Sequence, residues 1–432
     1  MITIAILITV ILLLLSGTPL FAILAGVAIG TFYFIAKMSP EIIMGEMYRM
    51  TSVSALIAIP LFIFLGYYLT ETQFPKRMLA LFESWVGWFV GGLCLAAIVS
   101  TGVFTAFSGA SAITIVAFGG LIYPMLKGKG YSDKFNYGLI TSCGGPGILL
   151  PPSIAVIIYA IVAGIGVQGL FLACIIPALL LFSSQFVYSV IISRKERVPS
   201  LPFTFKAILK ATNDIKWELP LFIIVVFGVF FGFFTPSEAA VSAVIYALII
   251  EGFFLKEVPW NKVPGIIMES VKMTGAILLI MGFAMAFTNF LVDQEIPRQV
   301  YDFMKPYMSN KYVFLFYLNV LLIIVGCVMD VFSAILVVVP LIVPIANIYG
   351  IDPYHLGAIF LVNIEIGYLH PPVGINLYVS SMRFKRPVMQ LFFDVFPILC
   401  FLLVVLFLVT YCPFLSTALV RATGKAITYK LM

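Results

Sequence analysis

The chain has 432 residues, of which 62% are hydrophobic and only 10% are charged, and its formal net charge is +6. A water-soluble protein of this length could not cover its surface with so few polar side chains. Apolar runs of about 20 residues recur along the sequence, and each is long enough to cross a bilayer core of roughly 30 Å. We therefore predict an all-α polytopic membrane protein that contacts the lipid bilayer and binds no nucleic acid.

The N-terminal part begins with two apolar runs, at 2–17 and 19–36, and continues with a span at about 51–70. The first run has neither the basic start nor the cleavage motif of a signal peptide, so we predict a membrane helix there. Residues 1–73 are therefore expected to be N-terminal scaffold helices. The next stretch, 74–87, is amphipathic and is expected to lie at the membrane interface.

A first repeat is predicted at 74–192. Its segment 88–126 is apolar, with Gly and Ser clustered in the middle, and a broken helix is expected after it at about 135–164. Basic residues flank the apolar segment on both sides, at Lys76, Arg77, Lys127 and Lys129. Short loops rich in Lys and Arg stay in the cytoplasm, so both ends of the segment are expected on that side. We predict a re-entrant hairpin here, hairpin 1, in preference to two tight spans.

The middle region, 193–272, is predicted to hold a linker arm and further scaffold helices. Two polar linkers, at 193–216, where Lys and Arg concentrate, and at 256–272, are expected to be arms or membrane-surface helices. Thr235 and Glu238 stand at the spacing of a capping box, which predicts a helix start at this point.

Residues 111–160 recur without a gap 220 residues further on, and the charges around the two copies are reversed. Pro151 and Pro152 correspond in this way to Pro371 and Pro372. The loop inside the first copy is rich in Lys, whereas in the second copy the basic residues follow the copy. By the positive-inside rule the two copies should cross the bilayer in opposite directions. An inverted pair of repeats with broken helices is the architecture of a secondary transporter.

The second repeat is placed at 273–390. It is expected to contain hairpin 2 at about 313–345 and a second broken helix at about 355–382. A C-terminal helix and tail are expected at 391–432.

Each repeat contains a Pro-Pro pair inside a helix. Pro151 lacks the N–H that would bond to the carbonyl of Gly147, and Pro371 frees the carbonyl of Gly367 in the same way. A freed carbonyl in lipid costs several kcal/mol unless something binds it, and a sodium ion can do so. The half-helix that starts near Ser153 directs its positive end inward, where an anionic substrate would be stabilised. A plain proline kink is the alternative, but two copies at one repeat position favour ion binding.

Polar residues in apolar stretches are further candidates for function. Asp330, at the expected tip of hairpin 2, is predicted to belong to the transport site. Glu365 should either form a structural pair inside the bundle or take part in the site. His370 is either a hydrogen-bonded core histidine or a group that titrates or gates the site.

These motifs together resemble the large membrane subunit of a TRAP transporter (tripartite ATP-independent periplasmic transporter). The resemblance covers essentially the whole chain and is carried by FSGASA, GILLPPSI, GFFTPSEAA and GYLHPPVGINLYV, at 107–112, 147–154, 232–240 and 367–379. It implies an inverted-repeat, elevator-type transporter of the bacterial inner membrane. It also implies a small membrane subunit and a periplasmic binding protein that delivers an organic anion, such as sialic acid or a C4-dicarboxylate. Sodium is implied as the co-transported ion, with no organic cofactor.

The resemblance further implies two sodium sites with a substrate site between them. The first sodium site falls on hairpin 1 and the first break, at Thr105, Ser108, Gly147, Leu150 and Pro152. The second falls on hairpin 2 and the second break, at Gly326, Gly367, His370 and Val373. The implied substrate residues are Ser108, Ser111, Ser153, Asp330 and Asn376. The family usually has Thr where this chain has His370, so the second site depends on whether this position contributes its side chain or only its carbonyl.

The alternative function is that of a stand-alone sodium/divalent-anion symporter of the same inverted-hairpin superfamily. Those carriers resemble one another through Ser-Asn-Thr tripeptides at the hairpin tips, which this chain lacks. Catalysis is not expected, because no carboxylate pair, HExxH motif or Ser–His arrangement stands at a usable spacing.

Overall fold

A computed structural model of the chain describes residues 20–35, 37, 39, 41–50, 53–230, 233–308 and 310–423. Every regular element in these residues is a helix, as the composition predicts. Seven helices in the described part are long and apolar enough to cross a membrane, or up to nine spans if each bent pair is one span. The expected helix at 2–17 and the last part of the tail, 424–432, lie outside the described residues.

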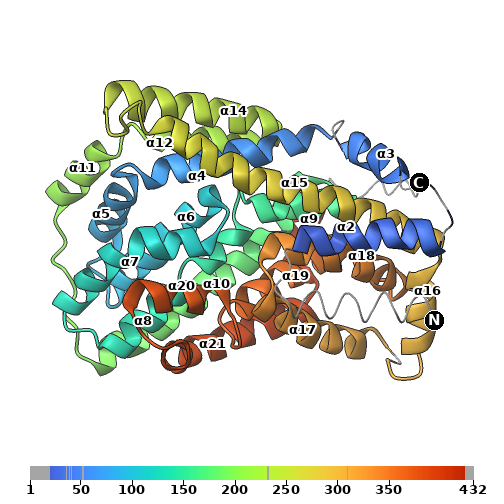
Figure 1. The fold of residues 1–432 in the computed structure, drawn as a ribbon. Coiled ribbons are helices and arrows are strands. Elements are labelled where there is room, and N and C mark those ends of the chain that lie inside the picture. The colour runs from blue at the N-terminus through green and yellow to red at the C-terminus, as the bar shows by residue number, and fades with distance from the viewer. Residues whose placement is uncertain are drawn as a thin grey trace.

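One side of the molecule is formed by long helices from the N-terminal and middle regions (Figure 1). These elements are α2 (Leu20–Gly30), η1 (Thr31–Ile35), α3 (Glu41–Met50), η2 (Ser54–Ile57), α4 (Ala58–Thr70), α14 (Pro236–Ala247), η5 (Leu248–Phe254) and α15 (Val263–Asp293). The predicted capping box begins α14, because Thr235 and Glu238 each bond to the other's backbone N–H. A short segment precedes it as α12 (Leu219–Phe222), η4 (Ile223–Phe227) and α13 (Gly228–Phe230).

The second half of the polar segment 256–272 is helical, but it is not separate from the span that follows it. Helix α15 begins at Val263 and runs unbroken to Asp293, across the expected boundary between the middle region and the second repeat. The polar residues that suggested a linker, such as Glu269 and Lys272, have side chains that are 58% and 63% exposed and pair with each other. They lie on the outer face of a continuous helix, so their polarity does not mark a break.

Two amphipathic helices, α5 (Phe74–Val86) and α11 (Phe205–Asp214), lie close together at one end of the molecule (Figure 1). The Trp85 indole donates to Thr212 Oγ1 at 3.3 Å and joins them. All four tryptophans are 39–49% exposed: Trp85 lies on α5, Trp88 and Trp217 lie in the turns after α5 and α11, and Trp260 lies in the turn before α15. Partly exposed tryptophan is typical of a membrane–water interface, which agrees with the expected interfacial position of 74–87.

Each segment expected to be a hairpin folds as a pair of apolar helices joined by a tight turn, and the re-entrant position of these pairs in the membrane stays a prediction. The first pair is α6 (Gly92–Ser108) and α7 (Ser111–Gly128), and the second is α17 (Lys311–Val328) and α18 (Val331–Ile348). Gly109 makes the first turn with a φ of 70°, a conformation that side chains other than glycine rarely adopt. A side chain there would also strike Ile154 at the start of the next half-helix, at 2.5 Å.

Both broken helices are interrupted where the Pro-Pro pairs predict. The first consists of α8 (Asp133–Ser142), the short 3-10 turn η3 (Gly145–Leu149) and α9 (Ile154–Val162), with a bend of 47° at the break. The second consists of α19 (Pro353–Gly367) and α20 (Ile375–Phe384). Each break leaves a short non-helical segment in the centre of the molecule.

The two broken helices lie head to tail. Arg386, just after the end of α20, stacks over the ring of Tyr137 near the start of α8, 4.4 Å from the ring centroid. At the other end, Tyr354 at the start of α19 lies against Gly169, where an added side chain would come within 2.8 Å of its hydroxyl. The start of each broken helix therefore meets the segment that follows the end of the other.

The remaining helices are α10 (Val167–Lys195), α16 (Ile296–Met304), α21 (Val388–Tyr411) and α22 (Phe414–Ala422). The sequence predicts only one helix in the C-terminal region, and α22 is an additional one. It is held by a polar contact, because Ser416 Oγ lies 2.7 Å from His355 Nδ1 at the start of α19. On the same face, Asn363 Nδ2 donates to Asn319 Oδ1 at 2.7 Å and joins α19 to α17.

Candidate functional site

The first break is packed tightly against hairpin 1. A methyl group added to Gly147 would lie 2.1 Å from the carbonyl oxygen of Gly102 and 2.7 Å from Thr105 Cβ. Thr105 Oγ1 lies 2.7 Å from Thr114 Oγ1, so α6 and α7 both present hydroxyls near the break. Thr101 Oγ1 also donates to the carbonyl of Cys143 at 3.1 Å. Only glycine permits this approach, and the result is a turn surrounded by hydroxyl and carbonyl oxygens.

The carbonyls of Gly147 and Gly367 are not free, which corrects the simple form of the proline argument. The Gly147 carbonyl accepts from Leu150 N at 3.1 Å, and the Gly367 carbonyl accepts from His370 N at 3.0 Å. The chain forms a tight turn before each Pro-Pro pair. The N–H of the residue just before the pair therefore donates to the carbonyl in place of the N–H that proline lacks. Because a carbonyl oxygen has two lone pairs, each retains one for a cation.

The second break is packed against hairpin 2 through two glycines. A methyl group on Gly367 would lie 2.6 Å from Gly326 Cα, so the backbones touch directly. Beyond the break, Gly374 N donates to the carbonyl of Cys327 at 2.9 Å. The His370 and Tyr368 carbonyls are both directed at Gly374, at 2.4 and 2.9 Å from a methyl group placed there.

The His370 side chain is turned away from this turn. Its Nδ1 lies 2.9 Å from the Ile366 carbonyl, one helical turn earlier, and its ring lies 6.2 Å from that of Phe392 on α21. The imidazole is therefore hydrogen-bonded, and a role in titrating or gating the site stays a prediction. The backbone carbonyl of His370, by contrast, lies against Gly374 in the break.

Two helix N-termini meet near the centre without side-chain caps. Helix α7 follows Ala110 and helix α20 follows Gly374, and neither residue offers a capping side chain. Ser111 in the first turn of α7 donates to Asn376 Oδ1 in the first turn of α20 at 2.7 Å. Asn376 is 1% exposed, and its amide nitrogen has no hydrogen-bond partner among the described residues. Two positive helix ends and a buried amide donor thus converge.

Asp330 occupies the matching position on hairpin 2 but acts as a cap. Its Oδ1 accepts from Phe332 N at 3.0 Å and Ser333 N at 3.1 Å, and its Oδ2 accepts from the Ser333 hydroxyl. Ser153 similarly caps α9, where it accepts from Val156 N at 3.5 Å. Both residues therefore accept from first-turn N–H groups of their helices, whereas α7 and α20 begin without a side-chain cap.

Several of the predicted site residues come together in pairs. Thr105 contacts Gly147, Gly326 contacts Gly367, and Ser111 bonds to Asn376. Ser108 ends α6, where a methyl group on Gly66 of α4 would lie 2.6 Å from its Cα. The other members, Leu150, Pro152 and Val373, lie in the two non-helical breaks; Val373 is 43% exposed.

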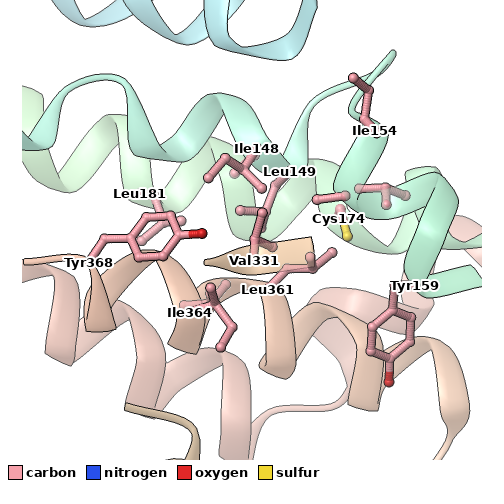
Figure 2. Close-up of a cluster of buried hydrophobic side chains, with 14 of the residues drawn as sticks. Ile148, Leu149, Ile154, Tyr159, Cys174, Leu181, Val331, Leu361, Ile364 and Tyr368 are labelled. Carbon is pink, nitrogen blue, oxygen red and sulfur yellow. The ribbon is translucent and has the colours of Figure 1, made fainter. Parts of the chain in front are cut away.

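The polar core around the Pro-Pro breaks includes residues that sequence reasoning left outside the site. Thr101 and Thr114 stand beside the first break, and helical spacing from Thr105 would have indicated Thr101. Apolar packing joins the two breaks: Figure 2 shows Ile148 and Leu149 of η3 opposite Leu361, Ile364 and Tyr368 of the α19 region. The two breaks and their oxygen clusters are thus held together as one unit.

A many-spanning helical fold with two hairpins packed on two broken helices defines a membrane permease. The family model described as "Tripartite ATP-independent periplasmic transporter, DctM component" matches residues 7–415. The chain belongs to this family of TRAP transporter large permease proteins. It is a multi-pass protein of the bacterial inner membrane, and its family is one of permeases, not of enzymes.

Its relatives include several named large permeases. The chain is 34% identical over 431 residues to the C4-dicarboxylate TRAP transporter large permease protein DctM of Rhodobacter capsulatus, covering 95% of this chain and 97% of the relative. It is 32% identical over 360 residues to the isethionate TRAP transporter permease protein DctMQ of Oleidesulfovibrio alaskensis, covering 83% and 57%. Among solved structures, the Alcanivorax borkumensis YdaH transporter has a TM-score of 0.61 at 13% identity, with 89% of this chain and 87% of that chain covered. The last comparison concerns the fold alone.

Proposed function

We propose that this chain is the transport subunit of a TRAP transporter that imports an organic acid anion together with sodium. The observation that carries the proposal is the pairing of each oxygen-rich break with a hairpin, on either side of two uncapped helix ends. The head-to-tail contacts of the broken helices support inverted repeats. In this proposal the repeats, 74–192 and 273–390, form a carrier that moves as an elevator against scaffold helices in 1–73 and 193–272.

Sodium coupling is supported by the chemistry of the oxygens. A sodium ion, like other hard cations, prefers carbonyl and hydroxyl ligands, and both breaks present these groups on glycine-enabled turns. At the first break the Thr105 hydroxyl and the Gly147, Leu150 and Pro152 carbonyls would hold the ion. At the second, the Gly326, Gly367, His370 and Val373 carbonyls would do so.

The substrate is proposed to bind by its acidic group between the ends of α7 and α20. Ser111 and the free amide nitrogen of Asn376 would donate to it, and the first-turn N–H groups of both helices would face the same charge. Ser108, Ser153 and Asp330 would border this position and shape the rest of the pocket. Relatives named for C4-dicarboxylates and isethionate handle acidic substrates, which agrees with this polarity.

The proposal includes two partners, a small membrane subunit and a periplasmic binding protein that delivers the anion. The relative named DctMQ is longer than this chain, which covers 57% of it. A fusion of both membrane subunits would explain such a length and its name.

The decisive experiment is uptake into proteoliposomes. We expect accumulation of a radiolabelled organic anion only with an inward sodium gradient, the small subunit and the binding protein all present. Uptake by this chain alone would identify a stand-alone symporter. Uptake that does not depend on the sodium gradient would contradict sodium as the coupling ion, but it would not affect the assignment of the chain to its family.

Asn376→Asp should weaken substrate binding strongly. The change places a negative charge where the free amide donor now points, and like charges about 4 Å apart repel by about 4 kcal/mol at an effective dielectric of 20. We expect at least about a 100-fold rise in KM for the anion. The control is Asn213→Asp on α11, an exposed residue that bonds to Lys216, which should leave KM unchanged. An unaltered KM in Asn376→Asp would show that the anion binds elsewhere.

A further inference from the structure

Glu365 is a carboxylate without a partner in the middle of the transport core. It lies on α19, two residues before the second break, and is 1% exposed. Neither of its carboxylate oxygens has a hydrogen-bond partner, and it forms no ion pair within the described residues. The structural pair that the sequence allowed for this residue is therefore not present.

The carboxylate is directed at the first break, on the other repeat. A methyl group on Gly145 would lie 2.1 Å from Glu365 Oε1 and 2.5 Å from its carboxyl carbon. Gly145 and Glu365 are also equivalent positions of the two repeats, since they share the 220-residue offset of Pro151 and Pro371. Equivalent residues of inverted repeats meet only near the pseudo-two-fold axis, so Glu365 lies between the two breaks.

The groups around the first break are neutral oxygens. Thr105 Oγ1 lies 3.2 Å from a methyl group placed on Gly144, and the Gly102 carbonyl lies against Gly147 on the same turn. Glu365 approaches Gly145, between these two glycines, from α19. A buried carboxylate with no cation or donor nearby costs several kcal/mol, which is why such groups are paired or coordinate metals. A cation held at this turn would be the missing partner.

We propose that Glu365, which belongs to the second repeat, supplies the negative charge of the sodium-binding core at the first break. The proposal rests on the sodium coupling proposed above and adds a residue that neither cluster of neutral oxygens contains. Through α19 the same residue adjoins Gly367 of the second break, so it links the two sodium positions. Removal of its charge weakens sodium binding without disturbing the fold.

The test is the sodium dependence of thermal stability in purified protein. A bound ion stabilises the folded state by RT ln(1 + [Na⁺]/Kd), so the melting temperature rises with sodium, with choline chloride keeping ionic strength constant. The Kd fitted with this relation is the sodium concentration that half-fills the site, and it is called the sodium midpoint. In Glu365→Gln this midpoint should be about 10- to 100-fold higher, as expected for the loss of one opposite charge nearby. Gly145→Ala, which displaces the carboxylate while keeping its charge, should move the midpoint the same way.

The matched control is Glu251→Gln on η5. Glu251 is also 1% exposed, and within the described residues its oxygens also lack hydrogen-bond partners, but it lies beside Arg77, far from the breaks in sequence and on a scaffold helix. Its sodium midpoint should match the wild type. Glu365→Asp should give an intermediate midpoint, because the carboxylate remains but its side chain is one methylene shorter.

The outcomes separate this inference from the proposed function. If the wild type shows neither a sodium-dependent melting temperature nor sodium-dependent uptake, the coupling itself is wrong. If the wild type responds and Glu365→Gln has the same midpoint, sodium coupling stands and Glu365 has only a packing role. A Glu365→Gln protein that changes only the pH dependence of uptake would also overturn the proposal, because the residue would then carry a proton.

Discussion

Gly147→Ala should reduce transport by roughly 100-fold, since a displacement of about 1 Å at a reacting or binding centre is known to cost that much. The added methyl group would lie 2.1 Å from the Gly102 carbonyl and 2.7 Å from Thr105 Cβ. The backbone of the first break and helix α6 must move apart to accommodate the methyl group. This movement displaces the oxygens that surround the first break. The measurement is the initial rate of sodium-driven uptake at equal amounts of purified protein.

Gly275→Ala is the control for this substitution. Gly275 lies in α15, and a methyl group there meets no atom within 4 Å. Alanine is a better helix former than glycine by up to about 1 kcal/mol, so this variant should transport normally and be equally or more stable. Wild-type uptake by Gly147→Ala would contradict the assignment of the first break to the transport site.

Arg77→Ala should destabilise the protein by about 3–5 kcal/mol, the usual cost of removing one partner from a buried ion pair. Arg77 on α5 forms ion pairs with Glu218 and Glu257 and lies 3.6 Å from Glu251. Glu218 and Glu251 are only 2% and 1% exposed, and Arg77 is the only cation paired with them in the part of the chain that the structure describes. The loss is measured as a fall in unfolding temperature in detergent.

Lys262→Ala provides the comparison on the surface. Lys262 pairs with Glu71 at 3.1 Å, but the two side chains are 57% and 44% exposed. Exposed pairs contribute about 0–1 kcal/mol, so the unfolding temperature should change little. Equal effects of Arg77→Ala and Lys262→Ala would show that the buried cluster does not hold α5 in place.

The effect of Arg77→Ala should also depend on pH. Burial raises the pKa of Glu257, but the Arg77 guanidinium and the Gln73 amide outweigh it and hold that pKa below its ordinary value. A carboxyl with a lowered pKa in the folded state stabilises the protein above its unfolded pKa of about 4 and loses this contribution as the pH falls further. The difference in unfolding temperature between Arg77→Ala and the wild type should therefore become smaller as the pH falls below about 4.

The breaks and hairpins could be predicted because local chemistry decides them. Proline cannot donate a backbone hydrogen bond, and Pro151 and Pro371 interrupt their helices wherever the rest of the chain lies. The turn at Gly109 and the capping box of Thr235 and Glu238 also depend only on neighbouring residues, and both lie in the segments where the sequence predicts a turn and a helix start. The family resemblance, carried by these same motifs, is confirmed by the match over residues 7–415.

Other features could not be predicted because they depend on neighbours from elsewhere in the chain. The Leu150 and His370 N–H groups satisfy the carbonyls that the prolines were expected to free. The sequence predicts a place in the transport site for Asp330, and only the structure shows that it also caps α18 through its bonds to Phe332 and Ser333. In α15, the polar side chains that resembled a linker lie along the exposed face of a continuous helix.

By itself the sequence determined the membrane class, the two-fold repetition and the positions of both breaks, since hydrophobicity, charge and proline act over a few residues. Only the tertiary structure decided which distant groups face one another. Ser111 meets Asn376 and Gly145 meets Glu365 because the broken helices pack head to tail, and each pair is more than 200 residues apart along the chain. No local interaction encodes such contacts, because they exist only once apolar burial has brought the two repeats together.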